Sequence, residues 1–451
     1  MEREKLATRL GFILLSAGCA IGLGNVWKFP YMTGQYGGSL FVLIYVFFLI
    51  LLGIPAMTME FSMGRAAKRS PVRIYQALQR PGNRWHIHGY ITLFGSCMLM
   101  MFYTGVAGWL INYFVKMASG TFNGLDPKAV AGVFGGMLGN PSELLGYMAF
   151  TIVLGFGVCA IGLQNGLERI NKYMMLALLV VMIGLIINSF SMPGASEGLK
   201  FFLVPDVDRF MKIGPFKVIL GALNQAFFTL SIGIGCMAIM GSYIDKERTL
   251  LGESVNVTIL DTIVAISAGL IIFPACFAYG IEADAGPSLI FITLPNVFNH
   301  MPMGQLWGAL FFVFMSFAAL STVFAVFENI ISCLMEMTGW SRQKTCVIGA
   351  VLMIILSAPC MLGFNVWSSF QPFGKGSCVL DLEDFIVSNL LLPGGAFIYV
   401  IFCTQRVGWG WDRFVAEANT GKGLKIQEWM RPILTYIVPV IILVILIGGL
   451  I

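Results

Sequence analysis

Two glycine-rich runs lie inside long apolar segments and could expose backbone groups that bind a ligand. One extends from Ala17 to Asn25 (AGCAIGLGN) and the other from Gln225 to Gly235 (QAFFTLSIGIG). Closely spaced glycines weaken a helix by about 1 kcal/mol each, and peptide groups left unpaired in lipid cost several kcal/mol each. A helix broken here would therefore persist only where something binds the freed groups. The alternative is that either run is a close-packing contact between intact helices.

A broken helix offers ligands for charges of both signs. The N-terminal end of a half-helix directs N–H groups at an anion, such as the carboxylate of an amino acid. The C-terminal end and the freed carbonyls present oxygen atoms to a cation such as Na+. Small Gly, Ala, Ser, Thr and Asn residues supply those oxygens without filling the space. The two runs therefore favour a site for a zwitterion and a cation.

The elements that position these runs must be membrane helices. The 451-residue chain is 57% hydrophobic and 11% charged, whereas soluble domains carry about 25% charged residues. This composition excludes a soluble globular protein, a secreted disulfide scaffold and a nucleic-acid-binding protein. Apolar windows of helix length predict an all-α membrane protein with eleven spans. The predicted spans are residues 11–36, 40–64, 88–117, 144–163, 170–191, 216–243, 254–280, 303–334, 345–362, 382–404 and 430–451.

Charges outside the spans predict the orientation of the chain. A cytoplasmic N-terminus puts about 20 Lys and Arg residues on the inner side and about seven on the outer side, as the positive-inside rule requires. The odd number of spans then places the C-terminus outside. No Pro-rich or Ser/Gly-rich linker divides the sequence. We therefore expect one transmembrane transporter domain over residues 1–451.

The two glycine runs occupy equivalent places in two halves of five helices each. Residues 11–191 form the first predicted repeat, residues 216–404 form the second, and residues 430–451 form an extra helix. Paired interruptions in equivalent helices are typical of inverted-repeat transporters, which bind their substrate near the bilayer midplane. The pairing therefore favours broken first and sixth helices over simple close packing.

The runs GCAIGLGNVWKFP (18–30) and NQAFFTLSIGIG (224–235) resemble the neurotransmitter:sodium symporter family, most closely its bacterial transporters of leucine and other hydrophobic amino acids. The similarity extends over essentially the whole chain. The resemblance implies a leucine-transporter-like fold in a plasma or inner membrane. It also implies sodium-coupled import of hydrophobic or neutral L-amino acids by alternating access, with two Na+ ions. The implied partners are the amino-acid substrate and the lipid bilayer, with no nucleic acid and no enzymatic activity.

The family's motif positions imply the residues of the site. The first sodium site would use Ala20, Asn25, Thr229 and Asp261. The second sodium site would use Gly18, Ile21, Ala318, Ser321 and Thr322. The substrate would contact Ala20, Leu23, Gly24, Leu99, Tyr103, Phe228, Thr229, Ser231, Ile234, Thr322 and Val326. The outer gate would pair Lys28 with Asp384, and the inner gate would pair Arg3 with Glu336, braced by Tyr243.

Asp261 stands where most family members have an asparagine. An ionised carboxylate at membrane depth costs about 2.5–3.5 kcal/mol, so it favours a nearby cation; a protonated, merely hydrogen-bonded Asp261 is the alternative. Animal members hold a chloride beside the first sodium with a tyrosine and a glutamine, matched here by Tyr45 and Gln225, and with hydroxyl or amide groups. One such hydroxyl position is Ala265 in this chain. We expect the Asp261 carboxylate to replace chloride, so that transport needs none.

Other positions bear on gating and on buried charge. Lys28 replaces the family's usual arginine, so we expect a looser outer gate, or only a solvated surface pair. Relatives often have a glycine and a proline separated by nine residues at the inner end of the fifth span. Gly166 and Leu176 stand there, which leaves unwinding of that helix open. Glu60 is expected to cap amides of the broken sixth helix, and Glu328 to be either structural or a proton-titrating group.

Three rival functions make different demands on the sequence. A proton-coupled amino-acid transporter of the same fold would replace the sodium ligands by a titratable group or a lysine, and Ser321 and Thr322 argue against it. An ion channel would need a ring of pore residues, for which the sequence has no repeat. An intramembrane hydrolase would need a nucleophile and a base at membrane depth, yet we expect His86, His88 and His300 in loops.

Overall fold

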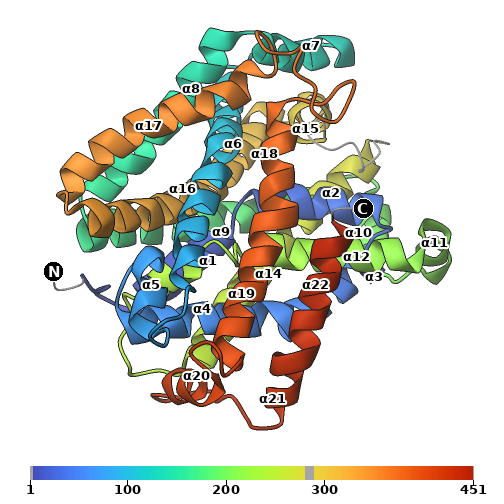
Figure 1. The fold of residues 1–451 in the computed structure, drawn as a ribbon. Helices are drawn as coiled ribbons and strands as arrows, with labels where there is room; N and C mark the ends of the chain where they lie inside the picture. Colours follow the sequence, from blue (N-terminus) through green and yellow to red (C-terminus); the bar gives the residue numbers. More distant parts are fainter. Residues whose placement is uncertain (1–3, 280–288, 450–451) are drawn as a thin grey trace.

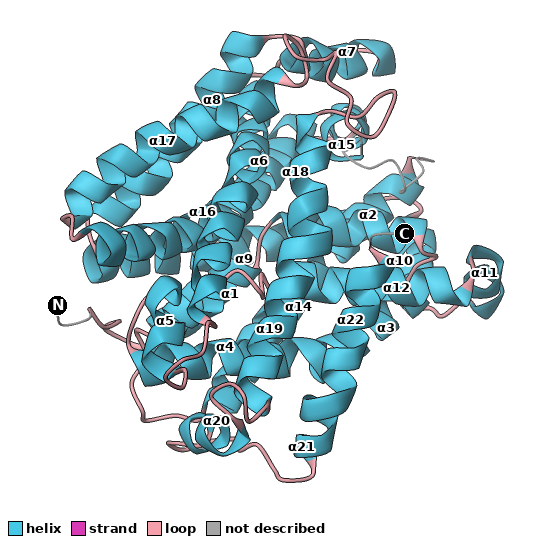
Figure 2. Cartoon of the chain, in the orientation of Figure 1, coloured by secondary structure: helices cyan, strands magenta, loops and turns pink. Residues whose placement is uncertain are grey.

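The computed structural model describes residues 4–279 and 289–449, and its regular structure over these residues is helical (Figures 1 and 2). In this described chain nine continuous helices are long and apolar enough to cross a membrane, and a bent pair of helices adds a tenth span. The sixth predicted span consists of α12 (Pro215–Thr229) and α13 (Cys236–Gly241) with a gap between them. All eleven predicted spans therefore have a counterpart.

The helices follow the predicted order, and short helices connect them. The spans are α1 (Arg9–Ala20) with η1 (Gly24–Lys28) and α2 (Phe29–Gln35), α3 (Ser39–Phe48) with η2 (Leu49–Gly53) and α4 (Ile54–Ala67), α6 (His86–Ala118), α8 (Pro141–Ala160), η3 (Leu163–Glu168) with α9 (Arg169–Phe190), α12 with α13, α14 (Leu250–Ala278), α16 (Gly304–Thr338), α17 (Arg342–Leu362), α18 (Val379–Phe385) with η5 (Ile386–Leu391) and α19 (Leu392–Thr404), and α21 (Met430–Pro432) with η6 (Ile433–Ile437) and α22 (Val438–Gly448). The connecting helices include α5 (Pro71–Leu78), α7 (Pro127–Leu138), α10 (Ala195–Leu203), α11 (Val207–Ile213), α15 (Leu294–His300) and α20 (Trp411–Ala418).

The first span is broken at its glycine run, as predicted. Helix α1 ends at Ala20, and the chain resumes as η1 and α2 after a bend of 53°. Ile21 and Gly22 lie outside regular helix. Because these residues leave the helix, their peptide groups are free to bind side chains of other helices or a ligand.

The sixth span is interrupted over residues 230–235, also as predicted. Three residues of this gap have positive φ angles: Ser231 (51°), Gly233 (107°) and Gly235 (82°). Glycine adopts such angles without a steric penalty, whereas the same region is strained for serine. Gly233 also lies against the start of α19, in the tenth span. An added Cβ at Gly233 would be 2.1 Å from the Leu392 carbonyl oxygen. The break thus needs glycine for both its conformation and its packing.

Five π-helical turns share a sequence signal, a proline two residues beyond the turn. A proline has no N–H to donate and its ring crowds the carbonyl four residues earlier, so the preceding N–H reaches back five residues instead. Phe29, for instance, donates to the Gly24 carbonyl. Four of the prolines lie inside predicted spans, where their effect on the helix was missed. The pairs are η1 with Pro30, η2 with Pro55, η4 (Leu289–Thr293) with Pro295, η5 with Pro393 and η6 with Pro439.

Helix α16 forms the centre of the bundle, where it crosses α6 and packs on α1, α8 and α9 (Figure 1). In its most apolar stretch 83% of the residues are buried, against 28% in the peripheral spans that contain α9 and α22. Large apolar side chains such as Ile183 and Val440 remain exposed on those peripheral spans. This distribution suits a bundle that presents its outer helices to lipid.

The bundle has two ends that carry the connecting helices. The N-terminus, α5 and α20 gather at one end, here called the N-terminal face, and α7, α11 and α15 gather at the opposite face (Figure 1). The prediction that all three histidines lie in loops is wrong. His86 and His88 belong to α6, and His300 ends α15. His88 is buried with its Nδ1 2.7 Å from the Tyr75 hydroxyl, which is a packing role.

Candidate functional site

The gap in the sixth span is held open by polar side chains of neighbouring helices. The Gly233 N–H donates to Glu60 Oε1 at 2.6 Å, which confirms the capping role expected for Glu60. The Ile234 carbonyl accepts from Ser96 Oγ and from Asn329 Nδ2, each at 3.1 Å. Sequence reasoning missed Asn329, although an asparagine deep inside an apolar span is itself a signal of a buried hydrogen-bonding role.

The freed groups of the first span also have partners. The Leu23 N–H donates to the Tyr103 hydroxyl at 2.9 Å, and the Gly22 N–H donates to Asn25 Oδ1 at 3.0 Å. Ser231 Oγ donates to the Cys19 carbonyl at 3.1 Å. The two breaks therefore face each other, and a side chain of one satisfies the backbone of the other.

Asp261 of α14 brings together the side chains of the predicted first sodium site. Asn25 Nδ2 donates to Asp261 Oδ1 at 2.8 Å, and Thr229 Oγ1 lies 3.3 Å from Asp261 Oδ2. Asp261 is 0% exposed, and among the described residues no Lys, Arg or His side chain contacts it. A buried carboxylate without a cationic partner attracts a cation. Ala20, the fourth predicted ligand, lines the adjoining cavity.

Tyr45 and Gln225, which match two positions of a chloride site, are both buried. The Tyr45 hydroxyl faces Asp261 and Thr229, whereas Gln225 Oε1 has no hydrogen-bond partner among the described residues. Gln225 Nε2 donates to the Gly24 carbonyl at 2.7 Å, so its amide is oriented by the first break. Ala265 is fully buried and contributes no hydrogen-bonding side chain. Of the positions that match a chloride site, Tyr45 therefore adjoins a carboxylate, and residue 265 has no hydroxyl.

All five residues of the predicted second sodium site converge between α1 and α16. Ser321 Oγ donates to the carbonyls of Ile21 at 3.2 Å and Ala318 at 2.8 Å. Thr322 Oγ1 lies 3.3 Å from the Gly18 carbonyl and 3.1 Å from the Ile21 carbonyl. The five neutral oxygens, linked by these contacts, suit a hard cation, which can take over the contacts that the two hydroxyls now make. The described residues contain no cluster of three His, Cys, Asp or Glu side chains of the kind that holds a metal.

A small cavity of about 10 Å³ lies between the two breaks, roughly room for one water molecule. It has a polar end, formed by Tyr103, Ser231 and Thr322, and an apolar wall formed by side chains of α6, α12 and α19. Predicted substrate contacts that line it are Ala20, Gly24, Leu99, Tyr103, Phe228, Ser231 and Thr322. Gly22 and Leu392 also line it and were missed.

The remaining predicted substrate contacts lie near the cavity without bordering it. Leu23 lines the larger outer pocket, and Thr229 is engaged with Asp261. Ile234 offers its carbonyl to Ser96 and Asn329, and an added Cβ at Gly95 would lie 2.9 Å from its side chain. Val326 is completely buried in α16. Ile234 and Val326 therefore pack behind the cavity wall in this structure.

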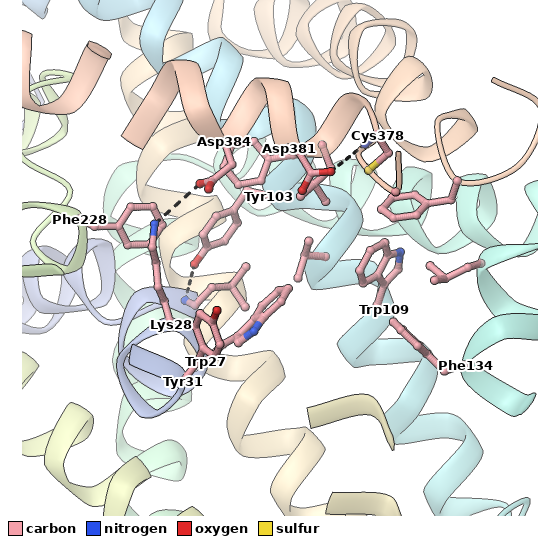
Figure 3. Close-up of a pocket in the computed structure, with 17 residues that line it drawn as sticks. Trp27, Lys28, Tyr31, Tyr103, Trp109, Phe134, Phe228, Cys378, Asp381 and Asp384 are labelled. Atoms are coloured by element: carbon pink, nitrogen blue, oxygen red, sulfur yellow. Dashed lines mark hydrogen bonds and ion pairs between the residues drawn. The ribbon is translucent and has the colours of Figure 1, made fainter. Parts of the chain in front are cut away.

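A vestibule of about 570 Å³ opens above the cavity toward the opposite face. Tyr103 and Phe228 border both spaces, so they separate the vestibule from the cavity (Figure 3). Lys28 Nζ lies 4.0 Å from Asp384 Oδ1 and 3.7 Å from the centre of the Phe228 ring. The expected outer pair is present at the limit of an ion pair, which agrees with a loose gate.

The N-terminal face is closed by a different set of charges. Arg3 lies outside the described residues, and Glu336 accepts from the Ser70 N–H at 3.0 Å and from its hydroxyl at 2.9 Å. The Tyr243 hydroxyl donates to Glu328 Oε1 at 2.6 Å. Arg342, which the sequence analysis missed, binds both Glu328 oxygens at 2.7 and 3.0 Å. This bidentate pair favours the structural role of Glu328 over proton titration.

The fifth span, which consists of η3 and α9, is helical at its end on the N-terminal face. The π-helical η3 leads directly into α9, so Leu176 belongs to continuous helix. Glu168 at the end of η3 accepts from the Ala7 and Thr8 N–H groups at 2.8 and 3.1 Å. Because this carboxylate binds the backbone just before α1, it holds the start of α9 against the first span.

Comparison with known proteins agrees with this geometry. The model of the sodium:neurotransmitter symporter family matches residues 3–123 and 136–451. An uncharacterized sodium-dependent transporter of Bacillus subtilis (strain 168), YhdH, is 36% identical over 97% of this chain and 96% of its own. An uncharacterized sodium-dependent transporter of Haemophilus influenzae is 33% identical over 100% of this chain and 98% of its own.

The fold has a close counterpart among solved structures. The crystal structure of MhsT in complex with L-phenylalanine superposes with a TM-score of 0.88 at 36% identity, and covers 99% of this chain and 100% of that one. The fold is therefore the leucine-transporter-like fold expected from the broken helices. The matched length and the fold together show that this chain belongs to the sodium:neurotransmitter symporter family, a family of sodium-dependent transporters.

Proposed function

We propose that this protein is a symporter that couples the import of hydrophobic and neutral L-amino acids to two Na+ ions, without chloride. The observation that carries the proposal is the convergence of Gly18, Ile21, Ala318, Ser321 and Thr322 oxygens beside the cavity between the breaks. These oxygens belong to the first and eighth spans. A cation held there would fix the position of one span against the other.

The cavity is suited to a zwitterion with an apolar side chain. The Tyr103 hydroxyl lies at its polar end and accepts from the adjacent Leu23 N–H, so a carboxylate placed there would accept hydrogen bonds from both groups. That carboxylate would also complete the first sodium site beside Asn25 and Asp261. Leu99 and Phe228 supply apolar wall for the side chain. MhsT, solved with L-phenylalanine, supports this class of substrate.

Chloride independence follows from the charge of Asp261. The carboxylate is buried within hydrogen-bonding distance of Asn25 and Thr229, where it would balance the first Na+. A site with a permanent negative charge needs no second anion. Ala265 leaves out the hydroxyl that a bound chloride would use.

Alternating access would expose the cavity first to one face and then to the other. The vestibule reaches the cavity from the opposite face, while ion pairs and Glu168 close the N-terminal face. With the N-terminal face in the cytoplasm, Na+ would enter from outside. Each charge gains about 2.3 kcal/mol per 100 mV, so two Na+ with a zwitterion gain about 4.6 kcal/mol. That sustains an amino-acid gradient of about 10³.

Uptake by the purified protein in liposomes tests the proposal. Radiolabelled leucine and phenylalanine should accumulate with an inward Na+ gradient, and accumulation should fall to background when K+ replaces Na+. Replacing chloride with gluconate at constant Na+ should leave the rate unchanged. Uptake that ignores Na+ but follows a proton gradient would overturn the coupling, and loss of uptake in gluconate would overturn the role given to Asp261.

A further inference from the structure

The residue at the start of α19 has no role in the proposed function so far. We propose that Leu392 determines which side chains the transporter accepts, as a movable wall of the central cavity. This inference rests on the proposed function and adds a specificity-determining residue from α19, in the tenth span. Leu392 is 2% exposed and lines the cavity with Leu99 and Phe228.

The cavity must enlarge to hold an amino acid, because in this structure it has room for about one water molecule. Much of its lining cannot move aside. Gly22 and Gly24 have no side chain, and an added Cβ at Gly22 would lie 2.3 Å from the Tyr103 hydroxyl oxygen. Tyr103 and Thr322 are held by hydrogen bonds to the first break. The large apolar side chains Leu99, Phe228 and Leu392 are left to make room.

These three residues differ in how firmly their backbone is held. Leu99 lies in the middle of α6, a regular helix of 33 residues. Phe228 lies in the last turn of α12, and Lys28 Nζ sits over its ring at 3.7 Å. Leu392 follows the π-helical η5 directly and donates its N–H to the Val387 carbonyl, five residues back. A π-turn holds one extra residue that a local change of register can move.

The sequence after Leu392 weakens the first turn of α19 further. Pro393 cannot donate a backbone hydrogen bond, and Gly394 and Gly395 follow it. These residues also contact the sixth break: an added Cβ at Gly395 would lie 1.9 Å from the Gly233 carbonyl oxygen. A shift of Leu392 is therefore transmitted to the unwound segment that lines the same cavity. The size of residue 392 then sets the size of substrate that fits.

Two substitutions of opposite size test this assignment, with a matched leucine as control. Leu392→Ala enlarges the cavity and Leu392→Phe reduces it, while Leu390→Ala changes a leucine of η5 that does not line the cavity. Sodium-dependent binding of radiolabelled leucine is competed with alanine, leucine, phenylalanine and tryptophan. A difference of one methylene group between two substrates changes their relative affinity for an apolar pocket by about 10-fold or more. We expect Leu392→Ala to shift the tryptophan-to-alanine affinity ratio at least about tenfold toward tryptophan, and Leu392→Phe to shift it toward alanine.

The control and the sodium response separate specificity from damage to the fold. Leu390→Ala should keep the wild-type ratio, and all three variants should keep the wild-type half-saturation concentration of Na+. Affinities that fall in parallel for every amino acid in both Leu392 variants, or an unchanged ratio, would overturn the inference. A wild-type protein that binds none of these amino acids in Na+ would instead overturn the proposed function.

Discussion

The two candidate cation sites lie on either side of one unwound turn, yet they are built from different chemistry. The Asp261 site contains a buried carboxylate together with Asn25 and Thr229. The Ser321 and Thr322 site contains only neutral oxygens, three of them backbone carbonyls. The first therefore attracts a cation through net charge, whereas the second depends on geometry alone.

This difference suggests that the ions in the two sites have different roles. The charged site adjoins the place proposed for the substrate carboxylate, so the ion there would couple directly to the substrate. The neutral site joins α1 to α16, so the ion there would instead stabilise one arrangement of the helices. Removing charge from one site should thus cost more than removing a single oxygen from the other.

The largest effect is expected from Asp261→Asn, which keeps the shape of the side chain but removes its charge. A hydrogen bond or contact to a charged group contributes about 1.5–3 kcal/mol, so the half-saturation concentration of Na+ should rise about 10- to 100-fold. Equilibrium binding of labelled leucine over a range of Na+ concentrations measures this change. An unaltered sodium response would mean that Asp261 is protonated and merely hydrogen-bonded.

A second substitution should recover part of that loss by restoring an anion site. In Asp261→Asn/Ala265→Ser the new hydroxyl would join the Tyr45 hydroxyl, which lies next to residue 261. We expect chloride to increase sodium-dependent binding by several-fold in the double variant, and to have no effect on the wild type. Gluconate is the matched anion control. If chloride acts equally on the single variant, the hydroxyl is not what binds it.

A smaller effect is expected at the neutral site. Ser321→Ala removes one of five oxygens and its hydrogen bonds to Ile21 and Ala318. A hydrogen bond contributes about 0.5–1.5 kcal/mol, so the half-saturation concentration of Na+ should rise about 2- to 10-fold. Ser316→Ala is the control, because Ser316 lies on the same helix with a buried hydroxyl that has no partner in the described part of the chain. Equal effects of the two changes would argue against a sodium ligand at Ser321.

The sequence was most informative where one residue type has one physical consequence. Clustered glycines in two equivalent spans predicted both breaks, and buried Glu60 predicted the cap on Gly233, because unpaired groups in lipid must find partners. The family motif placed the five oxygens of the second site together. These contacts join distant parts of the chain, but each involves a backbone group that a helix break has freed or a position that the family motif specifies.

Prediction failed where a contact depends on how a turn and the surrounding packing direct one side chain. Leu392 lines the cavity because Pro393 induces a π-turn, and composition alone does not show where that turn directs the side chain. Arg342 was counted only as an inner charge, yet it pairs with Glu328, since α17 begins just after the end of α16 and its first residue lies beside that helix. Ile234 contributes its carbonyl to the site structure and packs its side chain against Gly95.

The smallest effect is expected at the outer gate, whose charges are far more exposed than Asp261. Lys28 and Asp384 have side chains 29% and 37% exposed and approach to only 4.0 Å. Arginine can form two parallel hydrogen bonds to a carboxylate where lysine acts as a point charge, but an exposed pair contributes at most about 1 kcal/mol. Lys28→Arg should therefore slow dissociation of bound leucine by no more than about fivefold and leave the sodium response unchanged. Lys28→Gln is the control and should speed dissociation. Glutamine has neither the charge of lysine nor the guanidinium group of arginine to hold α18 of the tenth span against the first span. A change in sodium affinity with either variant would show that the gate and the cation sites are not separable.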